Sequence, residues 1–113
     1  MELNEKTARA QIRRKITKKL VSALLDIVLL VHFQDEDFGA RDAIMFIRER
    51  FSIMMSPQKV YSTIYEMERE KLLEGFYEEG KKMYRVTELG KSTVKIATSS
   101  GEMQAFMLSM MVK

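Results

Sequence analysis

Residues 56–87 read SPQKVYSTIYEMEREKLLEGFYEEGKKMYRVT, where a helical pattern is followed by an alternating one. It opens with Ser56 and Pro57, a serine that can cap a helix and a proline suited to the first helical position. Apolar residues then recur at helical spacing, at Val60, Ile64 and Met67. This pattern predicts a helix over about 56–72.

The period of the sequence changes from helical to alternating after this helix. Residues 73–77 (LEGFY) and 83–87 (MYRVT) are two strand candidates. The five residues between them, 78–82, contain Gly80, which can supply the positive φ that a tight link needs. The sequence therefore predicts a β-hairpin directly after the helix.

Two helical patterns precede this segment. The first predicts one long helix over about 8–33, whose apolar stripe is Ile12, Ile16, Leu20, Ala23/Leu24, Ile27 and Val31. The second predicts a helix over about 40–51, which follows an acidic break at 34–37, and a last helix over about 87–98 follows the hairpin. Three helices and a hairpin form the winged helix-turn-helix, so the predicted fold class is mainly α with a small β-hairpin wing.

Length and composition limit the possible functions. The 113 residues suit one domain, with the winged helix expected over 1–98 and an apolar C-terminal helix over 99–113. There is no cysteine and one histidine, His32, which excludes disulfide frameworks and thiolate zinc sites and leaves little for acid–base catalysis. We therefore expect no enzyme, no metal site and no cofactor.

The chain opens without an export signal and lacks the run of about 20 apolar residues that a membrane span needs, so we expect a cytoplasmic protein.

Positive charge is concentrated at the start of the chain. Residues 1–19 carry seven basic and two acidic side chains, a net of +5, whereas the whole chain has a net of +3. A basic helix suits phosphate contacts or an anionic membrane surface, and a solvated helix face is the plain alternative. Because the apolar stripe of this helix continues into the most apolar part of the chain, packing against protein is the simpler use of that stripe.

The third helix and the hairpin supply candidate DNA contacts. In a winged helix the third helix buries one side on the first two helices and presents its other side to the major groove. Polar side chains there can contact base edges or phosphate, and basic side chains in the wing can follow the DNA backbone. The candidate DNA-binding residues are Ser56, Gln58, Lys59, Tyr61, Ser62, Thr63, Tyr65, Lys81, Lys82 and Arg85.

A further pattern spans the third helix and the end of the hairpin. It consists of Val60-Tyr61, Ile64, Met67-Glu68, Leu72 and, most specifically, Tyr84-Arg85-Val86-Thr87-Glu88-Leu89-Gly90. On these residues, the sequence over 20–95 resembles the PadR-like winged-helix regulators. In the third helix, Lys71 stands where that family usually has glycine, and Ser62 stands where it has proline. The resemblance implies a homodimeric transcriptional regulator, usually a repressor, whose dimer is built by C-terminal and sometimes N-terminal helices.

The two ends of the chain are the candidate dimer surfaces. A helix over 103–113 would be apolar nearly all round, and such a helix is not stable alone in water. A twofold dimer would cover it together with the N-terminal stripe, and would fix the separation of two recognition helices. The candidate dimerisation residues are Ile12, Ile16, Leu20, Met103, Phe106, Met107, Met110 and Met111.

Two functions remain open at this stage. The favoured one is a regulator that binds double-stranded DNA by sequence, with the chain itself as its second partner in a homodimer. The alternative is a winged-helix protein-interaction module whose third helix never meets DNA. A single face shared by Lys59, Lys81, Lys82 and the basic first helix favours DNA. The sequence does not indicate a small-molecule effector.

Overall fold

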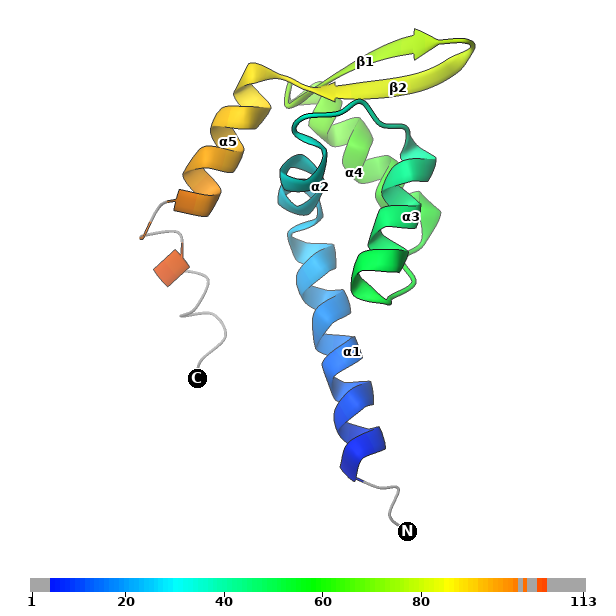
Figure 1. The fold of residues 1–113 in the computed structure, drawn as a ribbon, viewed down its shortest axis with the longest axis vertical. Helices are drawn as coiled ribbons and strands as arrows, with labels where there is room; N and C mark the ends of the chain where they lie inside the picture. Colours follow the sequence, from blue (N-terminus) through cyan, green and yellow to red (C-terminus); the bar gives the residue numbers. More distant parts are fainter. Residues whose placement is uncertain (1–4, 100, 102–103, 106–113) are drawn as a thin grey trace.

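The computed structural model describes residues 5–99, 101 and 104–105. Helices α2, α3 and α4 pack together beneath the hairpin, and α1 runs out beyond them (Figure 1). The predicted fold, mainly α with a small hairpin wing, is confirmed. In chain order the elements are α1 (Glu5–Ala23), α2 (Leu25–Phe33), α3 (Ala40–Phe51), α4 (Pro57–Arg69), β1 (Leu73–Glu78), β2 (Lys81–Val86) and α5 (Glu88–Ser99).

The long first helix predicted over about 8–33 is wrong, because it breaks at Leu24. This residue has φ −113° and ψ 26°, outside the helical region, so the chain forms two helices instead of one. The core takes a different stripe from the predicted one, formed by Val21, Leu25 and Leu29. The predicted stripe stays on the surface: Ile12, Ile16, Leu20 and Val31 are 57%, 50%, 40% and 39% exposed.

The core lies where α2, α3 and α4 meet. Helix α4 contributes the three side chains predicted for its buried side, although it spans 57–69 rather than 56–72. Burying a side chain of this size is worth about 1.5–3 kcal/mol relative to leaving it exposed. The largest side chains exposed by less than 2% are Leu25, Leu29, Leu30, Phe38, Ile47, Val60, Ile64 and Met67.

The hairpin is tighter than predicted. Strands β1 and β2 pair antiparallel all the way to Glu78 and Lys81, so the five-residue link over 78–82 is wrong. Only Glu79 and Gly80 lie between the strands, with φ of 52° and 79°. Two successive residues with positive φ are typical of a type I′ turn, whose twist matches that of the strands.

A short backbone pairing that the sequence did not predict joins the wing to the helices. Phe38, just before α3, pairs with Tyr84 of β2 through two hydrogen bonds. The N–H of Phe38 donates to the Tyr84 carbonyl at 3.0 Å, and the N–H of Tyr84 donates to the Phe38 carbonyl at 2.7 Å. A single bridge leaves no periodic signal in the sequence, so alternation of polar and apolar residues does not predict it.

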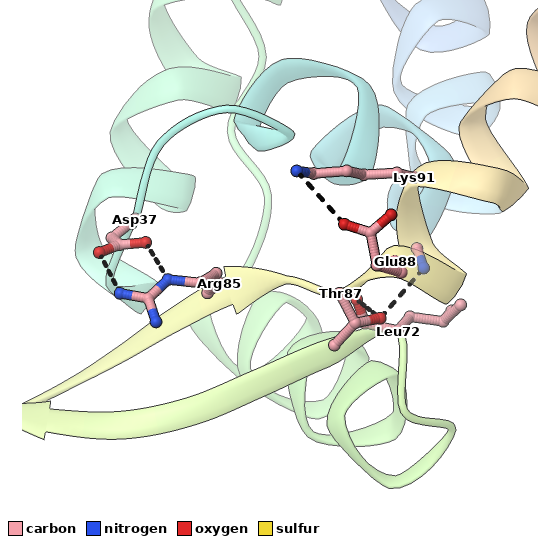
Figure 2. A network of polar contacts seen from close by, with 7 residues as sticks. Asp37, Leu72, Arg85, Thr87, Glu88 and Lys91 are labelled. Carbon is pink, nitrogen blue, oxygen red and sulfur yellow. Dashed lines mark hydrogen bonds and ion pairs between the residues drawn. The ribbon is translucent and has the colours of Figure 1, made fainter.

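Thr87 ties the end of the wing to the end of α4 (Figure 2). Its hydroxyl lies 2.7 Å from the carbonyl oxygen of Lys71 and 3.2 Å from that of Leu72, and it accepts the N–H of Gly90 at 3.1 Å. A Cβ at Gly90 would lie 2.6 Å from the Leu72 carbonyl oxygen, so a larger residue would push α5 away from this turn. The Thr-x-x-Gly part of the PadR-like pattern is therefore a structural joint.

Helix α4 ends in a left-handed residue. Lys71 has a φ of 68°, and the N–H groups of Lys71 and Leu72 donate to the carbonyls of Glu68 and Met67 at 3.0 and 2.9 Å. This pair of bonds is the Schellman motif, in which the left-handed position is usually glycine. The backbone thus explains why the PadR-like pattern has glycine where this chain has Lys71.

We expect Lys71→Gly to raise the free energy of unfolding by about 1 kcal/mol, because it removes the Cβ strain of the left-handed conformation. Urea unfolding of the two proteins measures the difference. Lys71→Ala is the matched control: it also removes the charged chain but keeps the Cβ, so it should show no such gain. Equal stability of the glycine and alanine variants would contradict this explanation.

Candidate nucleic-acid interface

The side of α4 opposite its buried residues is a continuous polar surface. It consists of exposed side chains at steps of three and four residues, and we call it the outward face of α4. Tyr61 and Tyr65 on this face are 54% and 63% exposed, so neither ring is used in the core. Amide, hydroxyl and guanidinium groups in this arrangement can bond to base edges in a groove. The outward face consists of Gln58, Tyr61, Ser62, Tyr65 and Arg69.

Arg69 belongs to this face and was not predicted from the sequence. Its guanidinium lies 5.8 Å from the centroid of the Tyr65 ring and 3.8 Å from a carboxylate oxygen of Glu66. The available signal was its position four residues after Tyr65, which puts the two on one side of a helix.

The small hydroxyl residues of α4 are bonded within the helix. Ser56 is the predicted N-cap, and its Oγ accepts the N–H of Lys59 at 3.1 Å. The hydroxyls of Ser62 and Thr63 both donate to the Lys59 carbonyl, at 3.1 and 2.8 Å. A hydroxyl that donates its proton in this way still has lone pairs, so Ser62 is arranged to accept from a base amino group.

Lys59 and Thr63 lie on the flank of α4 rather than on its outward face. They line a hollow of about 250 Å³ with Asp26 of α2 and with Glu66 and Glu70 of α4. Three carboxylates around one lysine make this flank acidic, which disfavours phosphate. The structure therefore separates these two predicted contacts from Gln58 and Ser62.

The two lysines of the wing point to opposite sides, since neighbouring strand residues alternate. Lys81 is exposed beside the turn. Lys82 turns back towards α4, where its Nζ lies 3.5 Å from an Oε atom of Glu68 and 5.2 Å from the centroid of the Tyr77 ring. Lys82 thus connects the wing to α4, and Lys81 is the lysine presented at the tip.

Arg85 fastens the wing to the loop before α3 (Figure 2). Its Nε and Nη2 donate to the two carboxylate oxygens of Asp37 at 2.9 Å each, and its guanidinium lies 4.6 Å from the centroid of the Phe76 ring. These bonds hold the pKa of Asp37 below its ordinary value and raise the pKa of Arg85. Arg85 was predicted to contact DNA, and the structure shows that it is paired with Asp37, where it positions the wing.

Of the predicted dimerisation residues, the structure describes those on α1. Ile12, Ile16 and Leu20 form one exposed apolar stripe, which no part of the described chain covers. Leu89 and Ile96 of α5 are also more than half exposed, at 53% and 62%. The other predicted dimerisation residues lie outside the described residues; they are Met103, Phe106, Met107, Met110 and Met111.

The part of the chain that the structure describes contains neither a metal-ligand cluster nor a helix that could span a membrane. The His32 ring stacks on Phe46, with centroids 3.7 Å apart. Within residues 5–99, 101 and 104–105, no three histidine, aspartate or glutamate side chains are grouped so that they could hold a metal ion. None of the helices in these ranges combines the length and apolar character that crossing a bilayer requires.

Comparisons with known proteins place the fold. Neither protein-family models nor curated proteins match the sequence. A PadR family regulator from Eggerthella lenta superposes with a TM-score of 0.71 at 15% identity, covering 93% of this chain and 96% of that one. A PadR family regulator from Clostridium difficile gives 0.67 at 19% identity, covering 80% and 99%. A transcriptional regulator from Clostridium thermocellum gives 0.69 at 18%, covering 84% and 96%.

These likenesses show that the chain has the winged-helix fold of PadR-like regulators, as the sequence resemblance predicted. They extend over most of each compared chain, so the likeness is not confined to the helix-turn-helix. At identities below 20% the likeness is one of backbone arrangement, and the function must be argued from the side chains of this chain.

We expect Asp37→Asn to lower the stability of the protein at neutral pH, because a neutral amide cannot accept both Arg85 bonds as an ionised carboxylate does. The folded-state pKa of Asp37 lies below the unfolded value of 3.8, so its stabilisation is present above that value and is lost as pH falls through the folded pKa. Urea unfolding across pH should therefore show the difference from wild type shrinking in acid. The control is Asp35→Asn, which removes a nearby exposed carboxylate. A difference independent of pH would contradict the ion-pair explanation.

Proposed function

We propose that this chain is a sequence-specific regulator of transcription that binds double-stranded DNA as a homodimer and acts as a repressor. The observation that carries the proposal is the outward face of α4. Gln58, Ser62 and Arg69 stand in line on it, opposite a fully buried stripe, so the helix can meet a groove without rearrangement. The wing would lie along the neighbouring DNA backbone, with Lys81 as its contact.

The chemistry of this face matches base recognition. A glutamine side chain pairs with adenine and an arginine with guanine, each through two hydrogen bonds in the major groove. Tyr61 and Tyr65 flank these residues with hydroxyls that can reach phosphate. The compared structures are described as transcriptional regulators, which supports the same role for this chain.

A protein-interaction module is the second candidate, and the wing is the observation that favours it. Glu78 and Glu79 stand at the tip, and Lys82 and Arg85 are paired within the chain, so the wing offers little net positive charge. The two candidates differ in the salt dependence of duplex binding. DNA binding through phosphates weakens steeply with salt, whereas a module of the second kind would not bind duplex.

We expect Gln58→Ala and Arg69→Ala each to change which DNA sequence is preferred, with a loss of about 1–3 kcal/mol at the affected base pair. Selection from a pool of randomised duplexes identifies the preferred site, and fluorescence anisotropy measures affinity for single-base variants of it. Lys95→Ala on α5 is the control, since it removes an exposed charge far from α4. An unchanged preference in both α4 variants would exclude these residues from base recognition.

The proposed dimer depends on the exposed stripe of α1. We expect Ile16→Glu to shift the protein to monomer, because the charge would be buried in a two-fold interface. Sedimentation velocity on the whole chain measures this. The control is Met45→Glu on α3, which alters an apolar side chain that is 41% exposed but lies off the stripe. A dimer that persists in Ile16→Glu would rule out this surface.

A further inference from the structure

Helix α1 carries a basic stripe that the proposed function does not use. Arg14, Lys15 and Lys18 line a cleft of about 590 Å³ against residues 52–54 of the turn between α3 and α4. All three side chains are exposed. None of the ion pairs formed within the described ranges includes them, and the sequence has no acidic residue between 6 and 25.

The cleft lies next to the start of α4. The side chain of Met54 forms part of the cleft wall and is 70% exposed. Met54 lies two residues before Ser56, the N-cap of α4. Figure 1 shows α1 running past the lower end of α3, where the chain turns into α4. The N-terminus of a helix is its positive end, so the charge of the stripe continues into the end of the helix that would enter the groove.

The like charges of the stripe repel one another. Residues three and four positions apart on a helix are neighbours, so Lys18 is close to both Arg14 and Lys15, and like charges at this spacing repel. Because this stretch of α1 contains no carboxylate, nothing on the helix itself offsets the repulsion. A partner with several negative charges would remove this cost.

The apolar stripe of α1 argues for DNA rather than a membrane as that partner. With 3.6 residues per turn, Ile12 and Ile16 lie roughly opposite Arg14 and Lys18 on the helix. A membrane that received the apolar stripe would occupy the exposed surface of Ile12, Ile16 and Leu20 that the proposed dimer uses. A second copy of the chain on the apolar stripe would leave the basic stripe open beside α4.

We propose that Arg14, Lys15 and Lys18 bind the phosphate backbone of the DNA that flanks the base pairs read by α4. This inference rests on the proposed DNA-binding function and adds a second contact outside the major groove. From Arg14 to Lys18 the helix rises about 6 Å, and this rise spans about two successive phosphates of one DNA strand. The stripe would therefore contribute affinity without sequence preference.

The test compares two triple variants of the whole chain. In one, Arg14, Lys15 and Lys18 are changed to glutamine; in the other, Lys6, Arg9 and Arg13 are changed to glutamine. Both remove three positive charges from the same helix, but only the first alters the stripe. The probes are two random-sequence duplexes, one just long enough for the α4 site and one with additional flanking base pairs. Anisotropy over a range of salt gives log K against log salt, and sedimentation and circular dichroism check assembly and helix content.

We expect the stripe variant to have a salt slope shallower than wild type by about 2, at about 0.9 for each phosphate that is no longer neutralised, and only on the longer duplex. The other triple variant should keep the wild-type slope to within about 1. Absence of duplex binding by the wild-type protein would overturn the proposed function and this inference together. Equal reductions of slope in both variants, with wild-type binding intact, would overturn the inference alone. The inference alone would also be overturned if the stripe variant kept the wild-type salt slope on DNA but no longer bound vesicles of anionic phosphatidylglycerol.

Discussion

Burial of Val60, Ile64 and Met67 determines what the molecule presents to a partner. These side chains are at most 1% exposed, and they fix the rotation of α4 about its axis. Once that rotation is fixed, the helical period leaves Gln58 and Ser62 facing outwards. The same constraint keeps the side chains of the neighbouring tyrosines in solvent. Exposure of large aromatic side chains is typical of a surface that binds a partner. The outward face of α4 is therefore a consequence of core packing.

The wing is positioned by bonds that use part of its own positive charge. Thr87 holds the base of the hairpin against the end of α4, while Lys82 reaches Glu68 and Arg85 binds Asp37. These contacts set the angle between the wing and α4. They also neutralise cations that would otherwise be available for phosphate. In this chain, exposed positive charge is found instead on α1, whose basic stripe stands beside the start of α4.

Apart from the break at Leu24, the sequence predicted the order of elements and the buried side of α4, because both depend on local periodicity. It could not choose between the two apolar stripes of the first helix, since Val21, Leu25 and Leu29 have the same spacing as Ile12, Ile16 and Leu20. The role of Arg85 was also out of reach, because its partner is 48 positions away in the chain. Long-range pairing of side chains has no local signature, and it decides which basic residues remain available at the site.

In the proposed function, the outward face of α4 meets DNA. Amide chemical-shift mapping of the isotope-labelled protein with a random-sequence duplex can detect this contact residue by residue, because every backbone N–H reports separately. We expect the largest changes at Gln58, Ser62, Tyr65 and Arg69, with smaller ones at Lys81. Changes confined to α5 or the far side of α3, with the α4 amides unmoved, would contradict this expectation.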